Sequence, residues 1–290
     1  MDVKVPESLL IAAGWGLYPR LIAEGARKAG VRQITVLGFR GGVDRQLVKM
    51  ADKVELLPFG SLGRFFERVN ANHCDAVMLG GQIRPGYLFR ARFDDLARAE
   101  FRRMKVRNAH TLYGRLADMI AERGIEVLPA SLFMADHIPR EGLLTKRAPD
   151  EREQAAMRLG LETGMAVCNL DIGQTVIVKD GVVLAVEGFE GTDAAIKRGA
   201  KLGGRGVTVV KVAKEGHDMR FDIPVIGMRT MALLRRCRIR TLGLQAGRIV
   251  ILEQQQVIAE ADRQGIAIQA VESGLAHAPT VPRAGKVAPG

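Results

Sequence analysis

The first half of the sequence alternates short apolar runs with segments of helical periodicity, and this alternation restricts the fold more than any other feature. We predict strands over residues 9–13, 34–38, 54–56, 76–79 and 125–128. Helices are expected over residues 18–29, 62–70 and 109–123. Short buried strands joined by helices imply a parallel sheet with right-handed crossovers. The sequence therefore predicts an α/β protein whose N-terminal domain, residues 1–135, is Rossmann-like.

The second half has a different pattern. Residues 136–150 are polar and contain two prolines, which predicts a linker. Two strands, 175–179 and 182–187, flank Asp180-Gly181, a pair typical of a tight hairpin turn. Further expected elements are helices over 151–159, 194–201, 230–237 and 257–264, strands over 207–212 and 266–270, and a pair of strands around Ala246-Gly247. We predict a distinct α/β C-terminal domain over residues 151–270 and a disordered tail over 271–290.

Cysteine content and hydropathy indicate the cellular compartment of the protein. The three cysteines, Cys74, Cys168 and Cys237, are odd in number and widely spaced, so neither a disulfide framework nor a zinc site can be built from them. No run approaches the roughly 20 apolar residues that a membrane-spanning helix needs. We therefore expect a soluble, cytoplasmic protein.

The net charge of +11 points to an anionic partner. Residues 84–107 contain eight basic and three acidic residues, and a second basic group lies at residues 235–240. A phosphorylated ligand, a membrane surface or a nucleic acid would each fit this charge. With three tyrosines, one tryptophan and no interleaving of aromatic and basic residues, stacking on nucleic-acid bases is disfavoured.

A glycine-containing loop follows the first strand. Gly14 and Gly16 open the first helix, where small residues let backbone N–H groups approach a phosphate. A dinucleotide fingerprint would need a third glycine where Pro19 stands and an acid near the end of the second strand, but no acid occurs before Asp44. A nicotinamide-dependent oxidoreductase is therefore weakly supported. A ligand contact and a simple tight turn both stay open for these glycines.

The richest group of polar residues lies in the second half. Glu187, Glu190 and Asp193 place three carboxylates in one turn region, a donor type that Mg²⁺ prefers. Thr192 could bind substrate or cap the following helix. Lys211 could hold a diphosphate, and Asp222, flanked by two apolar residues before a proline, could bind metal or activate water.

The chain resembles a known family at these residues, the LpxI-type UDP-2,3-diacylglucosamine pyrophosphatases of lipid A biosynthesis. The resemblance extends over nearly all of residues 8–270. The matching runs are Asp171-Ile172-Gly173-Gln174, Val178-Lys179-Asp180-Gly181, Glu190-Gly191-Thr192-Asp193, Arg220-Phe221-Asp222-Ile223-Pro224 and Gly80-Gly81-Gln82-Ile83-Arg84-Pro85.

The resemblance implies Mg²⁺-dependent hydrolysis of UDP-2,3-diacylglucosamine to UMP and 2,3-diacylglucosamine 1-phosphate, carried out by the C-terminal domain. It places the family's essential aspartate on Asp222. Other site residues that we expect are Gly14, Gly16, Lys179, Thr192, Lys211 and Arg220 for substrate, and Asp222, Asp193 and Glu190 for metal. The resemblance also implies a homodimer, and the basic residues suggest peripheral contact with the inner membrane. A non-catalytic nucleotide- or polyanion-binding protein is the alternative.

Overall fold

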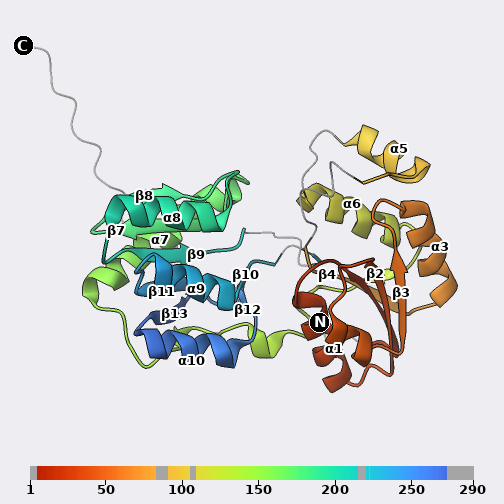
Figure 1. Cartoon of the computed structure of the whole chain (residues 1–290), viewed down its shortest axis with the longest axis horizontal. Coiled ribbons are helices and arrows are strands. Elements are labelled where there is room, and N and C mark those ends of the chain that lie inside the picture. The colour runs from red at the N-terminus through yellow and green to blue at the C-terminus, as the bar shows by residue number, and fades with distance from the viewer. Residues whose placement is uncertain (1–4, 83–90, 105–108, 215–219, 222, 273–290) are drawn as a thin grey trace, which may run out of the picture. The chain divides into compact units, whose positions relative to one another are not determined.

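A computed structural model describes residues 5–82, 91–104, 109–214, 220–221 and 223–272 (Figure 1). The chain forms two compact units that are interleaved in sequence. The first comprises Met1–Ile138, Ala213–Arg229 and Arg248–Val257, and the second comprises Pro139–Val212, Thr230–Gly247 and Ile258–Gly290. The predicted domains were continuous along the chain, whereas two later segments return to the first unit.

A five-stranded parallel sheet forms the centre of the first unit. Its strand order is β3-β2-β1-β4-β5. The strands are β1 (Ser8–Ala13), β2 (Gln33–Phe39), β3 (Lys53–Leu57), β4 (Ala76–Gly80) and β5 (Glu126–Val127). This order, in which the chain moves outward from β1 and then crosses back to β4, confirms the predicted Rossmann-like α/β architecture.

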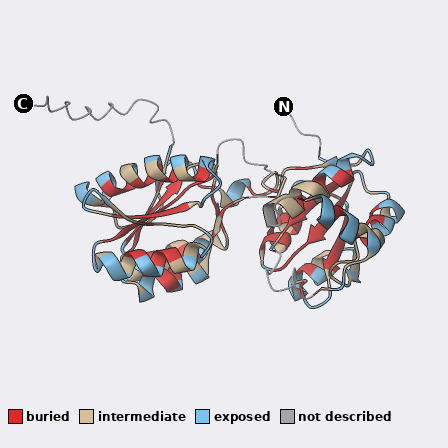
Figure 2. Cartoon of the chain, turned by 90° about the horizontal axis from the view of Figure 1, so that it is seen from above, coloured by how far each residue is buried: buried red, intermediate tan, exposed pale blue. Residues whose placement is uncertain are grey.

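Helices cover both faces of this sheet (Figures 1 and 2). Leu9 and Ile11 of β1 pack toward α1, whereas Leu10 and Ala12 pack toward α3 and α6, as expected when alternate side chains of a strand point to opposite faces. The helices are α1 (Tyr18–Lys28), α2 (Arg45–Met50), α3 (Leu62–Asn72), α5 (Asp95–Arg103) and α6 (Ala109–Ala121). The sequence did not predict α2 or α5.

Two short strands complete the first unit. β10 (Val225–Ile226) pairs in parallel with β12 (Val250–Ile251). The two strands predicted around Ala246-Gly247 are present as β11 (Thr241–Gln245) and β12, and they lie in different sheets, since β11 belongs to the sheet of the second unit. Gly247, at φ +69°, lies in the turn that sends the chain from one sheet to the other.

A mixed six-stranded sheet forms the second unit, in the order β6-β13-β11-β9-β7-β8. Its remaining strands are β6 (Gly142–Leu143), β7 (Thr175–Lys179), β8 (Val182–Val186), β9 (Thr208–Lys211) and β13 (Ala267–Val271). The other helical elements of the chain are the 3-10 turn η1 (Ala135–His137), α7 (Glu151–Asn169), α8 (Thr192–Gly203), α9 (Met228–Arg236) and α10 (Gln254–Gln264). The predicted hairpin is present, with both Asp180 and Gly181 at positive φ.

The expected linker and the expected disordered tail flank the predicted C-terminal domain in the sequence. The expected linker contains β6, which pairs antiparallel with β13 and so belongs to the second sheet. Nearly all of the expected disordered tail lies outside the described residues. No helix in the described part of the chain is long and apolar enough to cross a membrane.

Candidate active site

One edge of the second sheet gathers the ends of several strands. Lys211 ends β9, and Thr175, which begins β7, lies beside it in the pairing register. Gln245 ends the neighbouring strand β11, and the chain leaves β8 at Glu187 and enters α8 at Thr192. Ligands of open α/β sheets bind outside the carboxyl ends of parallel strands, and this edge has that position for β9 and β11.

Three side chains form a hydrogen-bonded group at this edge, which we call the Lys211 cluster. Lys211 Nζ donates to Thr192 Oγ1 at 3.4 Å, and Thr192 Oγ1 donates to Glu187 Oε1 at 2.7 Å. The second oxygen of Glu187 accepts from the backbone N–H of Gln174 at 3.3 Å. Thr192 therefore binds Glu187 and Lys211 and does not act as the side-chain cap of α8, whose N-cap residue is Gly191.

Lys211 is a buried cation, with only 8% of its surface exposed. Burial lowers the pKa of the Lys211 ammonium, while the charges of Glu187 and Asp193 oppose this shift. The first turn of α8 starts at Thr192, so the positive end of the helix dipole lies beside the same hydroxyl group. A buried lysine and a helix N-terminus together favour binding of an anion at this edge.

The two predicted metal ligands of the second unit are differently placed. The Glu190 carboxylate is exposed, pairs with Arg198 and accepts from the backbone N–H of Gly188 at 3.2 Å. The hydrogen bond from Arg198 lowers the pKa of Glu190. Asp193 is exposed in the first turn of α8 and acts electrostatically on Lys211. Of these two residues, Asp193 is thus the one whose charge acts on the Lys211 ammonium group.

Few of the described carboxylate side chains lie where they could bind Mg²⁺. Among the described residues, no group of three or more His, Cys, Asp or Glu side chains could hold a metal ion. Mg²⁺ in phosphate-binding sites usually takes one or two carboxylates and completes its shell with water and substrate oxygens. Asp193 could supply one such ligand, and the predicted ligand Asp222 lies outside the described residues.

Lys179 lies away from the Lys211 cluster. Its Nζ donates to the carbonyl oxygen of Gly203 at 2.7 Å, which is the last residue of α8. Thr192 is the first residue of the same helix, and twelve helical residues span about 18 Å. The structure therefore does not bring the predicted substrate residue Lys179 to Thr192 and Lys211.

The residues beside Asp222 are anchored to α6 of the first unit. Arg220 pairs with Asp118 at 3.0 Å, and the Phe221 ring stacks on Tyr113 with centroids 6.0 Å apart and an interplanar angle of 16°. On the other side, Ile223 packs against the core of the first unit. The predicted substrate residue Arg220 thus has a carboxylate partner within its own unit.

The glycine loop after β1 is bound to the loop after β4. The backbone N–H of Gly14 donates to Gly80 O at 2.7 Å, and that of Trp15 donates to Gln82 O at 2.9 Å. A Cβ on Gly14 would lie 2.8 Å from both Gln82 O and Tyr113 Oη, so this position requires glycine. These two N–H groups are therefore used within the protein, and a phosphate cradle here would depend on Gly16, at φ +102°.

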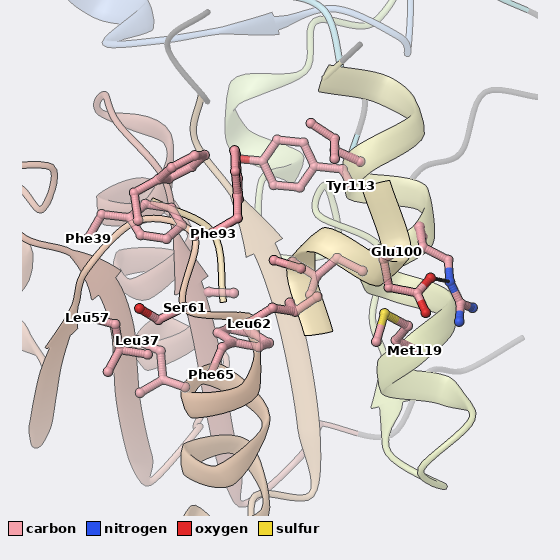
Figure 3. Close-up of a pocket in the computed structure, with 18 of the residues that line it drawn as sticks. Leu37, Phe39, Leu57, Ser61, Leu62, Phe65, Phe93, Glu100, Tyr113 and Met119 are labelled. Carbon is pink, nitrogen blue, oxygen red and sulfur yellow. Dashed lines mark hydrogen bonds and ion pairs between the residues drawn. The ribbon is translucent and has the colours of Figure 1, made fainter. Parts of the chain in front are cut away.

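An apolar pocket lies outside the carboxyl ends of β1, β2 and β3 in the first unit (Figure 3). Its walls come from the sheet, α3, α5 and α6, and its volume is about 130 Å³. The sequence does not predict this pocket, because the lining residues come from distant segments of the chain.

Both halves of the chain match a known family. Residues 8–137 match the LpxI N-terminal domain, and residues 140–269 match the LpxI C-terminal domain. The UDP-2,3-diacylglucosamine pyrophosphatase LpxI of Caulobacter vibrioides is 30% identical over 282 residues, which cover 90% of this chain and 96% of that protein. The chain belongs to the LpxI family. The resemblance inferred from the sequence motifs is confirmed.

Solved structures add little to the LpxI assignment. The biotin carboxylase domain of Hydrogenobacter thermophilus 2-oxoglutarate carboxylase aligns with a TM-score of 0.29 and 13% identity over 73% of this chain and 45% of that chain. A Campylobacter jejuni biotin carboxylase aligns with a TM-score of 0.28 and 11% identity over 68% and 42%. Scores this low carry no conclusion about fold or function.

Two buried polar residues of the LpxI C-terminal domain were missed in the sequence analysis. Gln245, 2% exposed, ends β11 beside β9, and its Nε2 lies 3.3 Å from Met165 Sδ. Thr175, 1% exposed, has a hydroxyl group without a hydrogen-bond partner among the described residues. A polar residue at the very end of a hydrophobic run was the available signal for both positions.

Proposed function

We propose that this protein hydrolyses the pyrophosphate bond of UDP-2,3-diacylglucosamine, releasing UMP and 2,3-diacylglucosamine 1-phosphate. The observation that carries the proposal is the 30% identity to a UDP-2,3-diacylglucosamine pyrophosphatase over 90% of the chain. The Lys211 cluster supports it, because a buried lysine beside a helix N-terminus suits a substrate with two adjacent phosphates.

In the proposed reaction, Lys211 binds a phosphate oxygen and offsets the charge that develops on the diphosphate as the bond to the leaving phosphate breaks. Thr192 orients the Lys211 ammonium, and Glu187 holds the Thr192 hydroxyl in place. Asp222, which the family resemblance marks as essential, is proposed to accept a proton from the attacking water or to bind metal. Mg²⁺, when bound, would neutralise further phosphate charge, and Asp193 is the candidate ligand beside the Lys211 cluster.

The assay uses the full-length protein and synthetic UDP-2,3-diacylglucosamine. Wild-type protein should release UMP with Mg²⁺ and lose this activity with EDTA. Asp222→Asn should lower kcat by a factor of about 10² or more, since it removes a charged group from the reacting centre. Asp136→Asn is a matched control, because the Asp136 side chain is 82% exposed. Full activity of Asp222→Asn would contradict the role given to Asp222.

We propose further that the protein contacts anionic lipid at the membrane where its substrate resides. Five cations surround a hollow at the C-terminal ends of α8 and α9 in the second unit, and none of them makes an ion pair with another described residue. They are Lys197, Lys201, Arg205, Arg236 and Arg238. Basic residues near an anionic bilayer contribute about 1 kcal/mol each. A homodimer is also proposed, on the family resemblance alone.

A further inference from the structure

We propose that the hollow at the C-terminal ends of α8 and α9 is a binding site for a multiply charged phosphate group, a phosphate monoester or a pyrophosphate. Its volume is about 340 Å³. Eight described residues line it, namely the five cations named above and the small residues Ala200, Gly204 and Cys237. Among the described residues, the lining contains no carboxylate that could neutralise the cations. Such a hollow holds one ligand, which goes beyond contact with a charged surface.

The hollow is a different site from the Lys211 cluster. Thr192, the first residue of α8, belongs to that cluster, whereas Lys201 lies in the last turn of α8 and Gly204 directly follows the helix. The 12 residues of α8 span about 18 Å. A ligand in the hollow therefore does not occupy the candidate active site, and the inference does not rest on the proposed hydrolysis.

Stabilisation of the helix ends explains only part of this charge. Cations in the last turn of a helix interact favourably with its dipole, and this accounts for Lys201 and Arg236. Lys197 lies in the middle of α8, and Arg205 and Arg238 lie beyond the helix ends. Arg238 has φ +56°, a left-handed conformation in which glycine or asparagine usually follows a helix. The side chain of Arg238 therefore explains its presence better than the backbone does.

The number of cations favours a ligand with more than one negative charge. The five like charges repel one another, and none of them makes an ion pair with another described residue. A phosphate monoester carries a charge of about −1.5 to −2 at pH 7 and offers three acceptor oxygens. Arginine binds such oxygens through paired N–H donors. The hollow should therefore bind phosphate monoesters and pyrophosphates more tightly than singly charged phosphodiesters.

Cys237 provides a reporter in the wall of the hollow. Burial raises the pKa of its thiol, and the charges of Lys197 and Arg236 oppose this shift. Cys74 is also partly exposed but lies in the first unit, so it serves as an internal reference. Cysteine reacts both with the anion iodoacetate and with neutral iodoacetamide, and a cationic hollow concentrates only the anionic reagent.

The test measures alkylation of each cysteine in the full-length wild-type protein by mass spectrometry at low ionic strength. The ratio of the iodoacetate rate to the iodoacetamide rate should be about tenfold or more higher at Cys237 than at Cys74. Saturating inorganic pyrophosphate should remove this preference at Cys237, and chloride at equal ionic strength should lower it less. Equal rate ratios at the two cysteines, or no effect of pyrophosphate at Cys237, would overturn the proposal.

Two double substitutions locate the site. Arg205→Gln/Arg236→Gln removes two of the five cations and should weaken protection of Cys237 by pyrophosphate about tenfold or more. Arg152→Gln/Arg158→Gln removes the same charge from exposed positions of α7 and should behave like wild type. Equal protection in the two folded variants would reject the assignment, and the wild-type titration decides if the first variant does not fold.

Lipid vesicles distinguish a soluble ligand from a lipid headgroup. Phosphatidylcholine vesicles with phosphatidic acid present a phosphate monoester, and vesicles with the same content of phosphatidylglycerol present a diester. Protection of Cys237 by pyrophosphate alone identifies a soluble phosphate compound, and additional protection by phosphatidic acid identifies a headgroup. Equal protection by phosphatidylglycerol would show that only surface charge is sensed and would reject the site. UMP release is not measured here, so failure of this test leaves the proposed hydrolysis untouched.

Discussion

At the scale of single residues, the buried ammonium group of Lys211 is costly for folding. Its ammonium group is buried at the end of β9, and burial lowers its pKa. Thr192 and Glu187 form the hydrogen-bonded chain that keeps the group in place. A protein gains little stability from such a buried charge, so its position beside a helix N-terminus is better explained by a negatively charged ligand.

Replacing Lys211 by an uncharged residue should lower the activity and raise the stability of the protein. We predict that Lys211→Met lowers kcat/KM by about 10²-fold or more, because a pre-placed cation is lost, and raises the melting temperature at neutral pH, because an apolar side chain of similar length replaces a buried charge. Lys179→Met is the comparison, since Lys179 binds the carbonyl of Gly203 at the far end of α8 and should affect stability more than hydrolysis.

The pH dependence of this stability difference has a defined sign. Because the pKa of Lys211 is lowered on folding, the unfolded chain binds the proton more tightly, and the cost of burying the charge falls as pH rises toward the unfolded value of about 10.4. The melting temperatures of wild type and Lys211→Met should therefore converge with rising pH. A gap that widens with pH would contradict the assignment of a buried, charged Lys211.

At the scale of elements, α5 forms a wall of the apolar pocket and is fixed by one residue at its start. Asp94 caps the helix by accepting from the backbone N–H of Ala97 at 2.9 Å, and its other oxygen accepts from Gly63 at 2.7 Å. A single carboxylate thus joins the beginnings of α5 and α3. The pocket wall depends on this junction.

Loss of the cap should destabilise the fold measurably. Asp94→Ala removes two backbone hydrogen bonds, and loss of an N-cap alone costs about 1 kcal/mol of unfolding free energy. We expect a lower melting temperature, measured by thermal unfolding. Asp95→Ala is the control, because the Asp95 side chain is 98% exposed. Equal effects of the two substitutions would show that the cap is unimportant.

The elements also show what sequence patterns can and cannot predict. Strand β1 and hairpin β7–β8 were predicted from local apolar runs and turn residues. Helix α7 is predicted to end at Leu159, yet it continues to Asn169. Gly160 packs against Val210 of β9 and Gly164 against Val212, the residue after β9, and neither glycine ends the helix. Tertiary contact outweighed the low helix propensity of glycine here.

In the candidate site as well, local patterns can be predicted from the sequence and contacts between distant segments cannot. Thr192 and Lys211, both predicted to bind substrate, are hydrogen-bonded to each other, and each lies next to the end of a predicted strand or helix. Lys179 was included through its motif, although it lies at the other end of the same helix. The apolar pocket and the partners of Glu100 could not be predicted, since they join segments far apart in sequence.

At the scale of the whole molecule, part of the net charge of +11 lies in a group of cations that form no ion pair with another described residue. The hollow beside the ends of α8 and α9 carries five such cations. Exposed apolar side chains lie nearby in the sequence, including Leu202 of α8 at 66% exposure. This combination suits transient contact with an anionic bilayer.

Membrane contact can be measured by co-flotation with lipid vesicles. We predict that the protein floats with vesicles that contain phosphatidylglycerol and not with neutral vesicles, and that added salt releases it. Reversing two charges in Lys201→Glu/Arg205→Glu should weaken binding by roughly tenfold or more, at about 1 kcal/mol per basic residue. Lys28→Glu/Arg32→Glu makes the same charge change on exposed residues of the first unit. If both pairs act alike, net charge and not this surface drives the contact.

The central claim is hydrolysis of a lipid-linked pyrophosphate, and the fate of the water oxygen tests it most directly. Full-length protein should be incubated with UDP-2,3-diacylglucosamine and Mg²⁺ in ¹⁸O-labelled water, and the products analysed by mass spectrometry. We predict UMP and 2,3-diacylglucosamine 1-phosphate, with a single ¹⁸O atom in one of the two phosphates. Release of UDP, products without label, or no turnover at all would contradict the account.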